Sequence, residues 1–60
     1  MDELSYARYI QRAKEAESIY KTIEELYEYI PWKQAYFMAI RDQLLSKEQK
    51  ELVKEFYPVK

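Results

Sequence analysis

The sequence predicts an all-α fold, a three-helix mini-bundle with a long first helix. Three observations support it: the 60 residues contain no Gly, the two prolines fall at positions 31 and 58, and apolar residues recur every three or four positions. Gly and Pro interrupt helices, and this spacing places side chains on one helical face. We expect a single domain spanning residues 1–60, near the lower size limit for folding without disulfides, metal or a partner.

The first helix is expected over about residues 3–30. Its apolar positions keep a heptad-like spacing for more than three repeats: Tyr6, Tyr9, Ala13, Ala16, Tyr20, Ile23, Tyr27 and Ile30. At about 100° per residue, the aliphatic and the tyrosine side chains separate onto adjacent edges of the helix. The second group, here called the tyrosine edge, consists of Tyr6, Tyr9, Tyr20 and Tyr27 with Ala13 between them.

The length of the first helix poses a question about its continuity. A helix over residues 3–30 would measure about 42 Å and the second helix about 21 Å, so half of the first would overhang unless the third helix or another chain covered it. A break between Ser18 and Thr22 is the alternative, because Ser18 could cap a new helix, or Thr22 and Glu25 could form a capping box. The unbroken heptad and the absence of Gly favour the continuous helix, which we expect.

Pro31 is expected to end the first helix and to open the second. Proline disfavours the helical conformation at Ile30 and lacks a backbone donor, yet it suits the first turn of a new helix. The second helix is expected over about residues 31–45. Its apolar side would consist of Trp32, Tyr36, Phe37, Ile40 and Leu44.

The third helix is expected over about residues 47–57. Ser46 and Gln49 have the spacing of a capping box at its start, and Pro58 would end it. The expected core unites the apolar faces of the three helices: Ile10, Ile19, Ile23, Leu26, Ile30, Phe37, Ile40, Leu44, Leu52, Val53 and Phe56.

The residue types argue against catalysis. There is no Cys and no His, which removes thiolate nucleophiles, Cys/His zinc sites and the side chain best suited to proton transfer near neutral pH. Glu24, Glu25 and Glu28 lie away from the apolar stripe and lack the spacing of a calcium loop. We therefore expect a protein that is not an enzyme and has no metal, cofactor or small-molecule substrate.

Charge is mixed along the chain. The net charge is −1, with −3 over residues 1–30 and +2 over residues 31–60, so neither half has the one-signed field of a nucleic-acid or membrane binder. If the second and third helices formed a helix-turn-helix, the acidic residues of the third helix would face the phosphates of DNA, which argues against DNA binding. No apolar run is long enough to span a bilayer, and the acidic N-terminus does not resemble a signal peptide. We expect a soluble protein, cytoplasmic if it is natural.

The seven tyrosines indicate a protein-binding function. Each tyrosine hydroxyl needs water or another hydrogen-bond partner, so these residues suit a partly solvent-exposed surface. Two interpretations stay open: the tyrosine edge is an interface or partly buried core, and Trp32 is an interface anchor or a plug at the corner between helices. The candidate partner-binding residues are Tyr6, Tyr9, Arg12, Ala13, Ala16, Tyr20, Tyr27, Trp32 and Tyr36. The partner would be another protein or a second copy of this chain.

Three segments carry a resemblance: the acidic start Asp2-Glu3-Leu4, the Ala/Glu/Lys-rich stretch from Ala13 to Glu17, and the segment from Ser46 to Val53. In these, and in lacking Gly, His and Cys, the chain resembles computationally designed helical mini-proteins made as binders. The resemblance covers the whole chain in style and implies a target-binding role for an aromatic helix face. The connections without Gly depart from that style. The alternative is a homodimeric helical structural or regulatory protein, for example a small phage or plasmid regulator.

Overall fold

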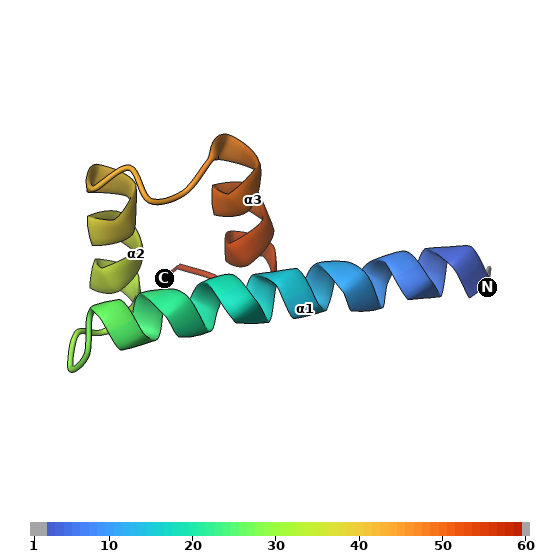
Figure 1. The fold of residues 1–60 in the computed structure, drawn as a ribbon, viewed down its shortest axis with the longest axis horizontal. Helices are drawn as coiled ribbons and strands as arrows, with labels where there is room; N and C mark the ends of the chain where they lie inside the picture. Colours follow the sequence, from blue (N-terminus) through green and yellow to red (C-terminus); the bar gives the residue numbers. More distant parts are fainter. Residues whose placement is uncertain (1–2, 60) are drawn as a thin grey trace.

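The computed structural model describes residues 3–59, and this range contains three helices and no strand. The helices are α1 (Glu3–Leu26), α2 (Trp32–Arg41) and α3 (Lys47–Phe56). α2 and α3 both rise from the same side of α1, over its C-terminal half (Figure 1). The prediction of an all-α, three-helix fold with a long first helix is confirmed.

α1 is one continuous helix, so the alternative with a break between Ser18 and Thr22 is wrong. The Thr22 hydroxyl donates to the carbonyl oxygen of Ser18 at 2.9 Å, one turn back along the same helix. Ser18 and Thr22 therefore both lie inside α1, and neither residue caps a second helix. A Thr side chain within a helix commonly bonds in this way to the preceding turn.

The first connection begins earlier than expected, because α1 ends at Leu26 and not near Ile30. The chain leaves the helix through a turn in which Tyr29 has a φ of 67° and a fully exposed side chain. A left-handed conformation is unusual for a bulky residue and interrupts the helix without a glycine. Pro31 then precedes α2, whose first residue is Trp32.

α2 also ends four residues before its expected end at position 45. Gln43 has a φ of 57°, its N–H donates to the carbonyl oxygen of Ile40, and the N–H of Leu44 donates to that of Ala39, both at 3.0 Å. This pair of bonds is a Schellman motif, which usually has glycine at the left-handed position. Gln43 thus ends α2 in a conformation that only Gly adopts without steric cost.

The capping box predicted for α3 is confirmed. The N–H of Gln49 donates to Ser46 Oγ at 3.2 Å, and the N–H of Ser46 donates to Gln49 Oε1 at 2.9 Å. These reciprocal bonds satisfy backbone donors that the first helical turn leaves unpaired. α3 ends at Phe56, one residue before the expected boundary.

The fully buried core is small and partly built from alanines: Ala16, Ile23, Ala35, Tyr36, Ala39 and Val53. The alanines allow the helices to approach closely. Three residues expected in the core are instead exposed: Leu26 at 57%, Phe37 at 52% and Leu44 at 48%. Leu26 and Leu44 fall where helices end, and Phe37 lies on the face of α2 opposite Ala35 and Ala39.

α1 extends well beyond the helices that cover it. Its 24 residues correspond to about 36 Å, close to the longest dimension of the molecule, 39 Å. The segment over residues 3–12, here called the N-terminal arm, projects past α3 (Figure 1). This overhang follows from the unequal helix lengths that the sequence predicts.

The strain at Gln43 gives a stability prediction. Gln43→Gly is expected to raise the free energy of unfolding by about 1 kcal/mol, because Gly adopts the left-handed conformation without the steric cost of a Cβ atom. Gln34→Gly, at an exposed position inside α2, is the matched control and is expected to lower it by about 1 kcal/mol. Urea unfolding followed by circular dichroism measures both, and equal effects of the two variants would refute the explanation.

Candidate protein-binding surface

An aromatic cluster joins the three helices. The rings of Tyr20 and Tyr57 stack with centroids 4.2 Å apart and an interplanar angle of 12°, and Trp32 packs against Tyr20 at 4.7 Å. Trp32 Nε1–H donates to the carbonyl oxygen of Tyr57 at 2.9 Å. Tyr20 and Trp32 are therefore committed to intramolecular packing, and the geometry supports the interpretation of Trp32 as a plug.

Two of the candidate partner-binding residues are buried, which corrects their assignment to a surface. Ala16 is fully buried, and Tyr36 is only 5% exposed. The Tyr36 hydroxyl donates to the carbonyl oxygen of Lys50 at 3.4 Å, and burial raises the pKa of this phenol. Neither side chain is therefore accessible to a partner in this structure.

Tyr27 is half-buried and links the ends of α1 and α2. Its hydroxyl donates to Asp42 Oδ2 at 2.6 Å. This hydrogen bond is the main cause of a raised pKa for the Tyr27 phenol and of a lowered pKa for the Asp42 carboxyl. Arg41 Nε lies 3.3 Å from the other Asp42 oxygen and also lowers the pKa of Asp42. Tyr27 thus serves a tertiary contact that the sequence pattern does not reveal.

Only the part of the tyrosine edge on the N-terminal arm remains available to a partner. Tyr6 and Tyr9 are 60% and 58% exposed, although Tyr9 also packs on Phe56 at a centroid distance of 5.5 Å. Arg12 forms an ion pair with Glu55, and Ala13 is half-buried beside it. The tyrosine edge therefore divides into a packed C-terminal part and an exposed N-terminal part.

Sequence reasoning missed two residues of this arrangement. Tyr57 completes the aromatic cluster, but it precedes Pro58 at a helix end, where helical periodicity assigns no face. Leu4 is 58% exposed on the arm, and it was missed because it does not belong to the tyrosine series. Since Leu4 precedes Arg8 by one helical turn, these two residues share one face of α1.

Glu24, Glu25 and Glu28 line an open depression together with Tyr29. Among residues 3–59, no cluster of three or more acidic, His or Cys side chains is arranged to hold a metal ion. In the same range, none of the helices has the length and apolarity needed to cross a membrane.

The aromatic cluster gives a prediction that separates the two parts of the tyrosine edge. Tyr20→Ala is expected to lower the free energy of unfolding by about 2 kcal/mol, because it removes ring contacts with both Trp32 and Tyr57. Tyr6→Ala, the matched control on the arm, is expected to change it by less than about 0.5 kcal/mol. Chemical denaturation measures both, and similar losses from the two variants would contradict the division.

The Tyr27–Asp42 hydrogen bond makes stability depend on pH. Since folding lowers the pKa of Asp42, its ionised form stabilises the fold above the ordinary Asp pKa, and this contribution disappears as the pH falls through the lowered value. We expect Asp42→Asn and Tyr27→Phe to lower the melting temperature at neutral pH and to approach the wild type as the solution is acidified. A constant difference between each variant and the wild type across the acid range would refute the linkage.

In comparisons with known proteins, no protein-family model, no curated protein and no solved structure matches this chain.

Proposed function

We propose that this protein is a non-enzymatic protein-binding module whose contact surface is the exposed part of the tyrosine edge, Tyr6 and Tyr9 on the N-terminal arm. The observation that carries the proposal is that the arm projects past α3, although Tyr9 and Arg12 still contact the end of that helix. α2 and α3 pack over the C-terminal half of α1, and the arm keeps two large aromatic side chains more than half exposed.

The physical properties of the arm suit recognition of a protein. Tyr6 and Tyr9 are three positions apart, so they lie on neighbouring positions of one helical face. Tyrosine offers a large apolar ring with few rotatable bonds and a hydroxyl that tolerates water, and it is enriched at protein interfaces. The arm is already helical, so a partner would not have to order it on binding.

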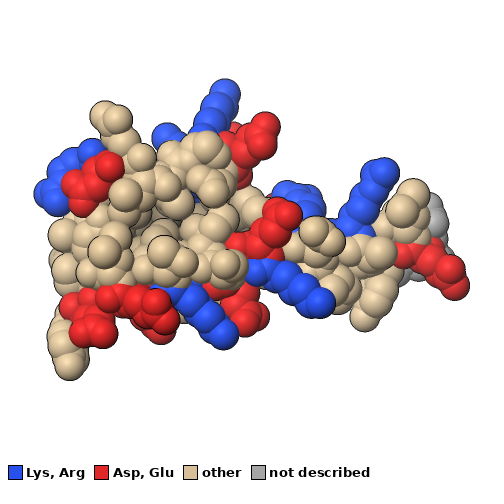
Figure 2. Space-filling view, in the orientation of Figure 1, with Lys and Arg blue, Asp and Glu red and all other residues tan. Residues whose placement is uncertain are grey.

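The form of the arm favours one mode of binding. A single helix that projects from a folded body can place one face into an apolar groove of another protein. Basic and acidic side chains are interspersed over the face of the molecule in Figure 2, which favours a protein partner over a polyanion. The proposal agrees with the role that the resemblance to designed helical binders implies.

Site-specific photo-crosslinking tests this function. A photoreactive amino acid replaces Tyr6 in the full chain, in the cell that expresses it, and the adduct is identified by mass spectrometry. The matched control carries the same group at Lys33, an exposed position on α2. We expect a discrete protein adduct from position 6 and none from position 33, because only the arm presents the contact surface.

A second substitution links the adduct to the tyrosines. Tyr9→Ala is expected to reduce the yield from position 6 about tenfold or more, as loss of a central aromatic contact does. Tyr29→Ala removes a fully exposed tyrosine far from the arm and is expected to leave the yield unchanged. Equal adducts from positions 6 and 33, or no adduct from either, would contradict the proposal.

A further inference from the structure

A shallow groove follows the junction of α1 and α3. On α1 it is lined by Arg8, Arg12 and Glu15 and continues to Ile19, which forms its wall together with Leu52 of α3. α3 rises across α1 and does not lie along it (Figure 1). At about 100° per residue, the groove lies on the side of α1 opposite Tyr6.

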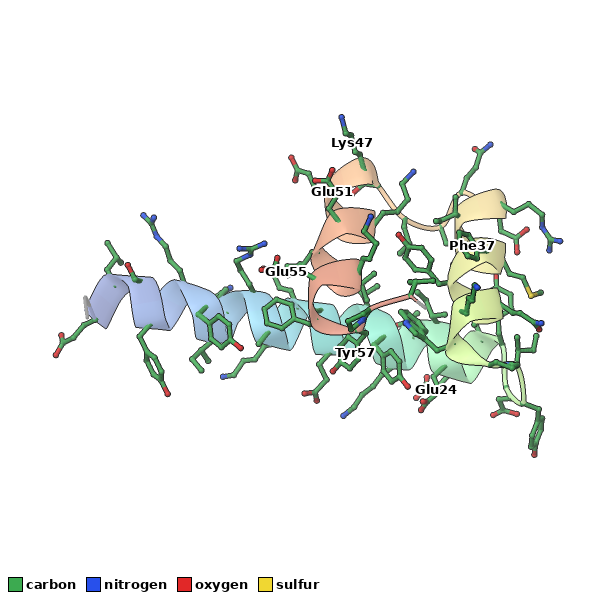
Figure 3. The ribbon with its side chains drawn as sticks, turned by 180° about the vertical axis from the view of Figure 1, so that it is seen from behind. Glu24, Phe37, Lys47, Glu51, Glu55 and Tyr57 are labelled. Carbon is green, nitrogen blue, oxygen red and sulfur yellow. The ribbon has the colours of Figure 1, made fainter. Side chains whose placement is uncertain are left out.

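The charges in the groove change sign along its length. Arg8 lies at the end on the N-terminal arm, and Arg12, which pairs with Glu55, lies where the groove reaches its acidic part. That part is lined by Glu15 and by the α3 residues Glu48 and Glu51. Figure 3 shows Glu51 on the side of α3 that faces the arm. A groove that is basic at one end and acidic towards the other is complementary to itself when a second copy lies in it head to tail.

We propose that a second copy of this chain occupies the groove, with the two α1 helices antiparallel and related by a two-fold axis. Leu4, Arg8, Glu15 and Ile19 point in directions within about 60° of one another on α1. A register that places Arg8 opposite Glu15 of the second copy also places Leu4 opposite Ile19, because positions run in opposite directions along antiparallel helices. The two-fold axis makes each contact twice.

The apolar parts of the groove match in the same register. Leu4, 58% exposed on the arm, lies over the half-buried side chains of Ile19 and Leu52 of the second copy. The arm of each copy then lies beside α3 of the other, which covers the part of α1 that its own helices leave bare. The same register therefore produces both the Arg8–Glu15 ion pairs and the apolar contact of Leu4 with Ile19.

The chemistry of the contact determines how the dimer behaves. Its specific contacts are exposed ion pairs, which salt screens, around a small apolar centre. The association is therefore reversible and weakens as ionic strength rises. The dimer goes beyond the proposed function and does not depend on it, because Tyr6 points away from the groove in both copies.

Sedimentation equilibrium of the full chain, from micromolar to millimolar concentration at low salt, tests the dimer. The wild type is expected to pass from monomer to dimer over this range. Arg8→Glu and Glu15→Arg each place like charges opposite one another, so each variant alone is expected to dissociate at least about tenfold more readily. Lys33→Glu, with the same charge change as Arg8→Glu but on α2, is expected to behave as the wild type.

Mixing the two variants makes the test specific to the register. In an equimolar mixture of Arg8→Glu and Glu15→Arg chains, every contact between unlike chains again joins an acid to a base, so a heterodimer is expected. Circular dichroism verifies that both exposed substitutions keep the helical fold. A wild type that stays monomeric throughout, a dimer insensitive to both substitutions, or a mixture that stays monomeric would each overturn the proposal. A monomeric wild type would leave the crosslinking result at position 6 unaffected.

Discussion

The contact of Tyr57 with Tyr20 and Trp32 is the interaction on which the rest of the structure depends. It brings the end of α3 to the base of α2 and holds both against α1, and Figure 3 shows Tyr57 against that helix. Half of the fully buried residues are alanines, which bury little apolar surface. The aromatic cluster therefore supplies contact area that a larger domain would obtain from an aliphatic core.

The position of this cluster determines what the chain presents to solvent. Because Tyr20 lies in the C-terminal half of α1, both short helices pack there, and the arm meets the end of α3 through Tyr9 and Arg12. The arm continues α1 as helix and contains Leu4, Ala7 and Arg8, whose residue types favour helix. The same constraint thus leaves the Tyr6 face open and leaves the groove beside α3 uncovered.

The sequence was sufficient for the helices and the Ser46–Gln49 cap because periodicity and capping are local properties. The sequence did not predict where α1 and α2 end. Tyr29 and Gln43 adopt left-handed conformations, which cannot be expected from these residue types. The sequence pattern also placed Phe37 in the core, because Phe is much more hydrophobic than the alanines on the opposite face of α2, which are the residues that are buried. For the candidate surface, periodicity placed the tyrosines on one edge but could not show that Trp32 and Tyr57 would cover only its C-terminal part.

The two proposed surfaces are geometrically compatible, and their combination has a physical consequence. A two-fold dimer through the groove directs Tyr6 of each copy outward, on opposite sides of the pair. A partner that repeats its own site could then engage both faces, and the second contact would form at the high effective concentration set by the rigid α1 helices. Two weak contacts, one at each tyrosine face, would then hold the partner more tightly than the contact of a single arm. Such a module would act through the spacing of its two tyrosine faces as well as through their chemistry.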